Sequence, residues 1–285
     1  SNNTAVGDDA LGANTTGSSN VAIGKSALKL NTTATQNVAV GDNALTANVT
    51  GTTNVAVGQS SLEDNTASNN TAVGYFSLRE NTSGTANVAL GKEALKSNTT
   101  ANHNTALGHQ ALEANTTGTF NNATGSNTLP ANTTGSFNDA HGYAVLNLNT
   151  TGTYNSGFGY FNLAANTTGS QNVAVGSLAL DANTTGNFNV GIGVHSLGGN
   201  TTASYNVAVG TNALKVNTTG SNNVAIGALA LDANTTAGSN TAVGVSSLGT
   251  NTEGFSNTAV GADSLTSNTT GDYNVAVGQF ALEEN

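Results

Sequence analysis

A unit of seventeen residues repeats along the whole chain, and this repeat constrains the fold more than any other feature. Written from Asn3, each unit reads N-V-A-V-G-x-x-A-L-x-x-N-T-T-G-x-x. The first position is Asn, the fifth Gly, the ninth Leu and the twelfth Asn in every one of the seventeen units. The step is 17 residues except for one step of 16 between Asn54 and Asn70. Such identity between copies within one chain indicates a structural task that every copy performs.

The unit is too short for helical repeats, which need about 33–47 residues for two or three helices. N-V-A-V-G is rich in β-branched residues and ends in Gly, which is typical of a short strand. The A-L pair three residues later favours a second, shorter strand, and N-T-T-G is turn chemistry. One unit therefore predicts one flattened coil, stacked on the next at ~4.8 Å in parallel. We predict an all-β fold, a parallel β-solenoid of the β-roll kind with seventeen coils, as one continuous array over residues 1–285.

The fixed residues predict structural roles. The ninth-position Leu is expected to fill the core, and the fifth-position Gly to have φ > 0 or a close backbone contact. The fifteenth position is Gly in most copies but Ala at Ala34, Ala101, Ala203 and Ala237, which argues against a left-handed conformation there. The Asn columns are expected to form amide ladders between coils, a structural role that we prefer to ligand binding. In two successive units these positions are Asn20, Gly24, Leu28, Asn31, Asn37, Gly41, Leu45 and Asn48.

The strand segment is apolar at the Val positions and also at the Ala between them. Successive side chains of a strand point to opposite faces, so both faces are predicted to be covered. One cover is the interior of the coil, and the other is a neighbouring chain. We therefore predict self-association, most simply as a threefold assembly. The alternative is that one face of Ala and Val is simply exposed.

N-V-A-I-G-x-x-A-L, at Asn20–Leu28 and Asn223–Leu231, resembles the head repeats of trimeric autotransporter adhesins. The longer N-T-T-G version is similar to repeats of bacterial and phage tail-fibre-like proteins. The resemblance covers the whole chain, although those head repeats are slightly shorter and this chain contains no neck, stalk or anchor. It implies a left-handed β-roll, three chains around one axis, and an extracellular or cell-surface role in adhesion or in a fibre.

The repeat becomes irregular between residues 119 and 163, where polar residues replace Val and aromatic residues gather. A functional interpretation is a patch that binds host or environmental glycans, because aromatic rings stack on sugars and a carboxylate accepts hydrogen bonds. The competing interpretation, which we favour, is a local change of packing. The candidate patch comprises Phe120, Phe137, Asp139, His141, Tyr143, Tyr154, Phe158 and Tyr160.

Composition narrows the possible partners. The net charge is −10 with only six basic residues, which does not favour nucleic acid or an anionic membrane. No apolar run approaches the ~18 residues of a membrane span. The four His residues are scattered, the calcium motif G-G-x-G-x-D is absent, and the carboxylates mostly occupy variable turn positions. We therefore expect no catalytic residue, no metal and no cofactor.

Most copies of the twelfth-position Asn also match the N-glycosylation acceptor pattern, although turn chemistry alone produces the same letters. Glycosylation is thus a hypothesis for Asn14, Asn31, Asn48, Asn81, Asn98 and Asn115.

The sequence as a whole favours an extracellular structural fibre or stalk, a stiff rod that assembles with copies of itself. The repeat runs from Ser1 to Asn285 without a polar cap, which predicts either a segment of a longer chain or subunits stacked head to tail. An adhesin that binds glycan or matrix through 119–163 is the alternative. Ice binding, suggested by the recurring Thr pairs, ranks third.

Overall fold

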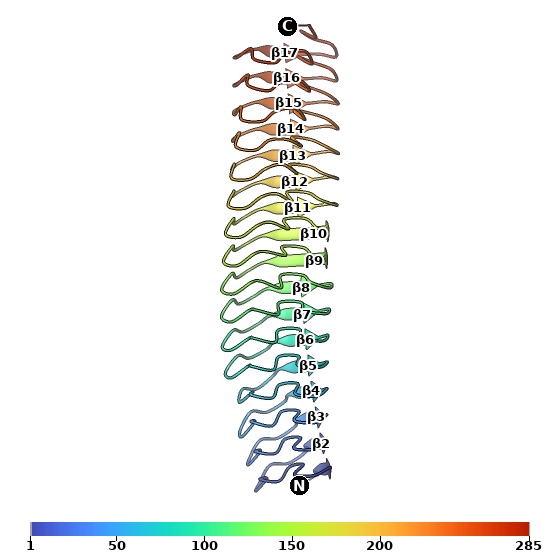
Figure 1. The fold of residues 1–285 in the computed structure, drawn as a ribbon, viewed down its shortest axis with the longest axis vertical. Coiled ribbons are helices and arrows are strands. Elements are labelled where there is room, and N and C mark those ends of the chain that lie inside the picture. The colour runs from blue at the N-terminus through green and yellow to red at the C-terminus, as the bar shows by residue number, and fades with distance from the viewer. Residues whose placement is uncertain (1, 285) are drawn as a thin grey trace. The chain divides into compact units, whose positions relative to one another are not determined.

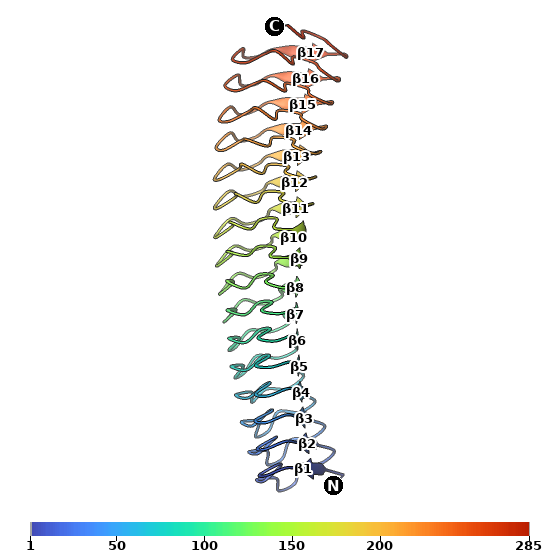
Figure 2. The same ribbon diagram turned by 45° about the vertical axis from the view of Figure 1, so that its right-hand side comes forward.

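A computed structural model describes residues 2–284, so Ser1 and Asn285 lie outside the description. Each repeat forms one coil with one short parallel strand, and Figures 1 and 2 show the strand on one side of each coil with loops opposite. No helix occurs among the described residues. The prediction of an all-β parallel β-solenoid is confirmed. The chain divides after His141 into two compact units, which are described separately below.

The first unit holds the strands up to β9, each paired in parallel with the next at a shift of one repeat, as in Val38↔Val55. The 16-residue repeat keeps this pairing, with Val55 opposite Thr71. The strands are β1 (Thr4–Val6), β2 (Val21–Ile23), β3 (Val38–Val40), β4 (Val55–Val57), β5 (Thr71–Val73), β6 (Val88–Leu90), β7 (Thr105–Leu107), β8 (Asn122–Thr124) and β9 (Asp139–Tyr143), whose last two residues belong to the second unit.

The second unit repeats the arrangement, for example with Val190 opposite Val207. Its strands are β10 (Ser156–Tyr160), β11 (Val173–Val175), β12 (Val190–Ile192), β13 (Val207–Val209), β14 (Val224–Ile226), β15 (Thr241–Val243), β16 (Thr258–Val260) and β17 (Val275–Val277).

The expected second strand is absent among the described residues, and that part of the prediction was wrong. The segment around A-L consists of turns. The ninth-position Leu residues have φ between 49° and 55°, in the left-handed region, and the residues at the seventh and seventeenth positions are left-handed too. A segment with left-handed residues at its seventh and ninth positions cannot extend as a pleated strand. Its N–H groups still bond the next coil, as Leu95 N–H does to the Ala111 carbonyl at 3.0 Å.

Leu forms the core, as predicted. The column from Leu28 to Leu265 is fully buried, together with the small residues at the third and eighth positions. A left-handed conformation disfavours an L-residue by about 1–2 kcal/mol. Burying the Leu side chain contributes about 1.5–3 kcal/mol, and the inter-coil hydrogen bond adds to it, so burial outweighs the strain.

The fifth-position Gly has φ between 122° and 142° in every coil, and an added Cβ would collide with the backbone of the next coil at positions from Gly7 to Gly261, but not at Gly278 in the last coil. At Gly58, for example, the nearest atom would be the Gly74 carbonyl oxygen at 2.5 Å. Position fifteen has no left-handed φ, which explains why Ala replaces Gly there.

The Asn columns form two amide ladders. In the first column, Oδ1 of Asn20 accepts from the Asn37 N–H at 3.0 Å, and Asn37 Nδ2 donates to the Gly51 carbonyl at 2.9 Å. In the second column, Asn98 Nδ2 donates to Oδ1 of Asn81 at 2.8 Å and to the Ala101 carbonyl at 3.1 Å. These side chains are buried and satisfy the backbone of the turns.

The second ladder is interrupted beside the 16-residue coil. The Oδ1 atoms of Asn31 and Asn48 are buried and have no hydrogen-bond partner among the described residues. The shortened coil lacks the fourteenth position, and Asn65 Nδ2 bonds the Ala67 carbonyl at 2.8 Å instead of reaching Asn48. The missing residue thus accounts for the unpaired Asn48 oxygen, whereas the Asn31 oxygen is unpaired because Asn48 Nδ2 donates only to the Gly51 carbonyl of its own coil.

Candidate functional site

The most extensive unusual surface is the outward face of the strands. In most strands the Ala at the third position of the repeat points inward, and the side chains at the second and fourth positions point outward. We call these outward side chains the outer sheet face. They are Val, Ile, Leu or Thr throughout β2–β7 of the first unit and throughout β11–β17 of the second.

These aliphatic side chains remain partly in water. Ile23 is 40% exposed and Leu90 is 44% exposed in the first unit, and Ile192 is 39% exposed in the second. A strand face turned to solvent ordinarily carries polar residues, so a repeated aliphatic face is the kind of surface that marks an interaction site. The structure therefore shows that the Ala side of the strand faces the core and the Val side faces outward.

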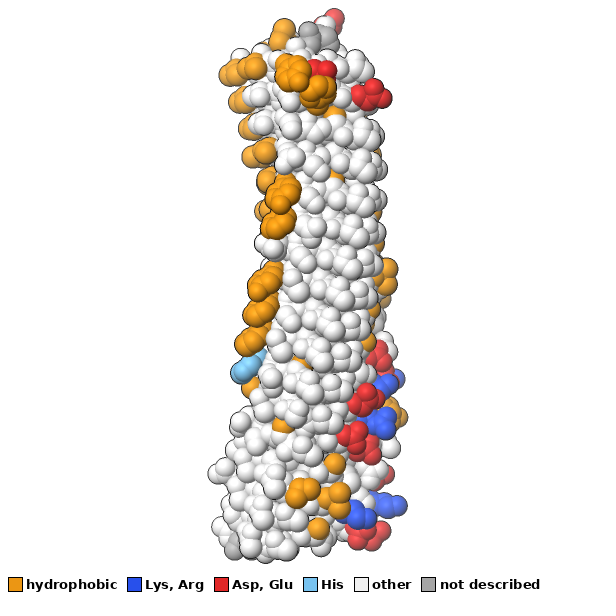
Figure 3. Space-filling view, turned by 90° about the vertical axis from the view of Figure 1, so that its left-hand side faces the viewer, with side chains coloured by type: hydrophobic (Ala, Val, Ile, Leu, Met, Phe, Trp, Pro, Cys, Tyr) orange, Lys and Arg blue, Asp and Glu red, His pale blue; other side chains and the backbone are white. Residues whose placement is uncertain are grey.

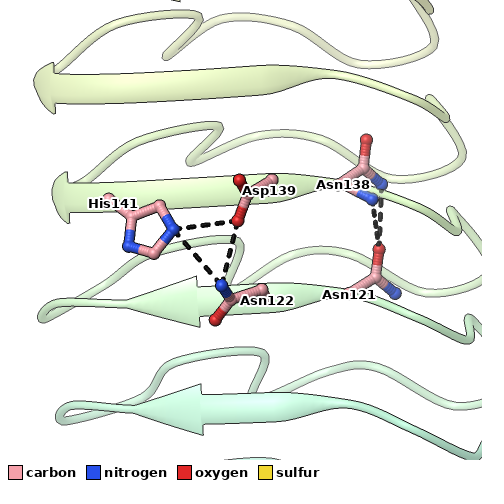
Figure 4. Close-up of polar contacts among 5 residues, drawn as sticks. All are labelled: Asn121, Asn122, Asn138, Asp139 and His141. Carbon is pink, nitrogen blue, oxygen red and sulfur yellow. Dashed lines mark hydrogen bonds and ion pairs between the residues drawn. The ribbon is translucent and has the colours of Figure 1, made fainter.

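Polar residues interrupt the outer sheet face at β8 and β9. The register places Asn122 opposite Asp139 and Thr124 opposite His141. Figure 4 shows that three of these side chains converge: Asn122 Nδ2 donates to Asp139 Oδ1 at 3.0 Å, and His141 Nε2 lies 2.8 Å from the same oxygen. The short distance favours the tautomer in which Nε2–H donates to the carboxylate. We call these three residues the polar cluster.

The polar cluster is partly exposed, with side-chain exposures of 33% for His141 and 45% for Asp139. It is therefore a surface feature that stays hydrogen-bonded within itself. No group of three or more His, Cys, Asp or Glu side chains placed to hold a metal ion occurs among residues 2–284.

The aromatic residues of the predicted patch form stacks along the coils. In the first unit, His103, Phe120 and Phe137 follow one another at the seventeenth position, with ring centroids 4.9 and 5.2 Å apart and planes within 6–11° of parallel. In the second unit, Tyr143 stacks on Tyr160 at 5.6 Å. Tyr154 is exposed at the seventeenth position, and Phe158 is exposed on the outward side of β10.

Such stacking determines what the rings offer to a ligand. Parallel rings at the spacing of the coils cover one another's faces and turn their edges outward, whereas sugars pack against ring faces. Hydrophobic side chains gather in a narrow line along one edge of a largely uncharged surface in Figure 3. The geometry of these stacks thus agrees better with packing ladders than with a sugar platform.

The stacks also extend beyond the predicted patch. His103 precedes Phe120 in its column, and Phe188 stacks on Tyr205 at 4.8 Å and 5° in the second unit. Their common seventeenth position in the repeat was the signal that would have found them. A separate contact, Arg79 over the Phe76 ring at 4.7 Å, lies on another side of the coil and had no such signal.

The candidate glycosylation residues point inward. Asn31, Asn48, Asn81, Asn98 and Asn115 are fully buried, and Asn14 is partly buried. Each Nδ2, the atom that would carry the glycan, donates a hydrogen bond to the fifteenth-position carbonyl of its own coil. A glycan there would require the turn to open, so the folded coil disfavours this modification.

Carboxylates cluster at the tenth and eleventh positions. Burial raises the pKa of Asp181 and of Asp232 above the ordinary 3.8. The pKa of Asp64 is also raised, mainly by burial and to a smaller extent by repulsion from Glu63. The exposed ion pair between Lys29 at the tenth position and Asp9 at the seventh position of the preceding coil, 2.9 Å apart, contributes little to stability.

A comparison with known proteins found no family model that matches the chain and no curated protein of similar sequence. The described residues include no helix long and apolar enough to cross a membrane.

Proposed function

We propose that this protein is a structural fibre or stalk protein that assembles with further copies of itself through the outer sheet face. The exposed aliphatic columns of β2–β7 and β11–β17 are the observation that carries the proposal. An extracellular or cell-surface location follows only from the resemblance to adhesin head and tail-fibre repeats.

The size of the face supports association. Fully burying a Val, Leu or Ile side chain is worth about 1.5–3 kcal/mol, so the most exposed outward side chains, which are about two-fifths exposed, each contribute roughly 1 kcal/mol and the others less. The outward side chains of β2–β7 together offer a gross gain on the order of 10 kcal/mol. Association costs about 4–15 kcal/mol, so a few coils are near balance and additional coils strengthen binding. Repetition of the coil is therefore a means of building affinity.

A second copy of the chain is the partner that fits best. Its columns have the same spacing, one row per coil at ~4.8 Å, so side chains of one face can pack between those of the other over many rows. On β11–β17, roughly 50 Å² of exposed surface per side chain gives on the order of 700 Å² per copy, close to the ~800 Å² typical of a stable interface.

The adhesin alternative has weaker support, because the stacked rings in each unit cover one another's faces. The ice-binding alternative also has weaker support than self-association. The thirteenth-position Thr hydroxyls bond the next coil, as Thr99 Oγ1 does to the Thr116 carbonyl at 3.1 Å, and are not free to order water.

The proposal is tested by measuring the mass in solution by analytical ultracentrifugation. We expect a multiple of 28.1 kDa for the natural chain. Val40→Lys combined with Val209→Lys places charges on the outer sheet face of both units and should give the single-chain mass. Thr33→Lys combined with Thr202→Lys adds the same charge at the exposed fourteenth position and should leave assembly intact. A natural chain of single-chain mass at ~100 µM, or equal disruption by both variants, would refute the proposal.

A further inference from the structure

The outer sheet face has a property that follows from its regularity. The rows from β2 to β7 present similar pairs of Val, Ile or Leu, with Thr71 and Thr105 in place of one Val in β5 and β7, so the face looks much alike after a shift of one coil. Two copies packed through such rows could slide by ~4.8 Å at the loss of a single row of contacts. Aliphatic rows alone therefore give affinity but leave several axial registers nearly equal in free energy.

The polar cluster removes this equivalence. Asn122, Asp139 and His141 stand in rows where other coils carry mostly Val, Ile, Leu or Thr. Asn122 Nδ2 and His141 Nε2 both bond Asp139 Oδ1, and they lie 3.2 Å from each other. Asp139 Oδ2 and Asn122 Oδ1 make no hydrogen bond with another described residue. In a register that sets these atoms against Val rows of another copy, a carboxylate and an amide oxygen would be buried without donors.

A register that brings the polar cluster opposite polar groups avoids this loss. The cluster contains donors as well as acceptors, since Asn122 Nδ2 has two hydrogens and His141 can donate. In one such register the polar cluster of one copy lies opposite the polar cluster of the other, and the two exchange hydrogen bonds. In another, the cluster lies opposite an opening in the interface and remains hydrated. Both arrangements fix the axial position, as a single buried Asn does in an apolar coiled-coil seam.

We propose that the Asn122–Asp139–His141 cluster sets the axial register in which two copies of this chain dock through the outer sheet face. The inference rests on the self-association proposed above. It assigns affinity to the aliphatic rows and specificity to the polar cluster.

The test uses a triple variant, Asn122→Val, Asp139→Val and His141→Val, which gives β9 the Val-Ala-Val start found in β3 and leaves Thr124 as the one polar outward residue of β8. Strands β4, β11, β13 and β17 also carry Val-Ala-Val, so the fold should persist, as circular dichroism can verify. A spin label is attached at Thr100→Cys, an exposed position on the loops, in a chain that has no other Cys. Double electron–electron resonance then measures the distances between labels on associated copies.

We expect one narrow distance for the natural sequence and several distances, separated by ~4.8 Å, for the triple variant. Thr117→Val combined with Thr134→Val, in the same coils but away from the outer sheet face, should keep the single distance. A triple variant that retains one narrow distance overturns the register proposal and leaves self-association standing, as does a natural chain that already shows several distances. A natural chain without any distance between copies overturns both.

Discussion

Substitution of Ala for the fifth-position Gly should be the most damaging small change to the solenoid, and Gly210 is a suitable place to test it. Its φ is +136°, and an added Cβ would lie 2.6 Å from the Gly227 carbonyl oxygen and 3.0 Å from the Ala228 nitrogen. These obstacles are backbone atoms of the next coil, so they cannot move aside like the end of a flexible side chain.

The expected loss combines two effects. An L-residue held at such a φ is strained by about 1–3 kcal/mol. Moving the next coil away also weakens inter-coil hydrogen bonds, such as Gly227 N–H to the Val209 carbonyl at 2.8 Å, and an unsatisfied buried group costs about 1–3 kcal/mol. We expect Gly210→Ala to lower the free energy of unfolding by roughly 3–5 kcal/mol.

Gly220→Ala is the matched control. On a fixed backbone its Cβ would also approach a carbonyl oxygen of the next coil, that of Ala237, but its φ is outside the left-handed region. The neighbouring coils already carry Ala203 and Ala237 at this position. We therefore expect a change within about 1 kcal/mol.

Urea unfolding followed by circular dichroism gives the shift in midpoint, and amide hydrogen exchange locates it. Because each coil contacts only its neighbours, Gly210→Ala should speed exchange most in the coils of β13 and β14. If the two variants shift the midpoint equally, the sign of φ is not what excludes Ala from the fifth position, and our reasoning about this turn is wrong.

Three further predictions follow from the ladders and the carboxylates. Asn206→Ala removes a buried amide that bonds two backbone groups, so we expect a loss of about 2–4 kcal/mol in urea unfolding. The exposed Asn222→Ala should lose only about 1 kcal/mol, because its left-handed φ suits Asn better than Ala; similar losses would contradict a structural ladder. Burial raises the pKa of Asp181 and of Asp232 above 3.8, so the folded chain binds these protons more tightly than the unfolded chain, and stability falls as pH rises from 3.8 through the folded pKa. Changing both to Asn should therefore raise the urea midpoint at pH 7 but not at pH 3, and an equal shift at both pH values would speak against this cause. Inserting one Thr after Thr66 restores the seventeen-residue step and should let Asn65 Nδ2 reach Asn48 Oδ1, giving a gain of about 1–2 kcal/mol; a lower midpoint would show that the short coil is not the cause of this unpaired oxygen.

The candidate site was only partly predictable. The apolar strand indicated that an outward face needs a partner, but alternation alone did not say whether Ala or Val faces outward. The coil decides this, because its thin interior accommodates Ala beside the Leu column and leaves Val outside. Likewise, the sequence placed Phe120 and Phe137 in one column, whereas only the stacked coils bring their rings to 5.2 Å with faces covered.

The sequence by itself determined the coil length, the parallel stacking, the Leu core and the buried Asn columns. Seventeen nearly identical units fold and stack alike, so a residue at a fixed position has the same surroundings in each coil. Only the tertiary structure decided that each coil has one strand. Leu28 and its equivalents take φ near +50° against their intrinsic preference, since burial and hydrogen bonds to the next coil outweigh the local strain. The convergence of Asn122, Asp139 and His141 is likewise a product of the coil-to-coil register, which brings residues seventeen positions apart side by side.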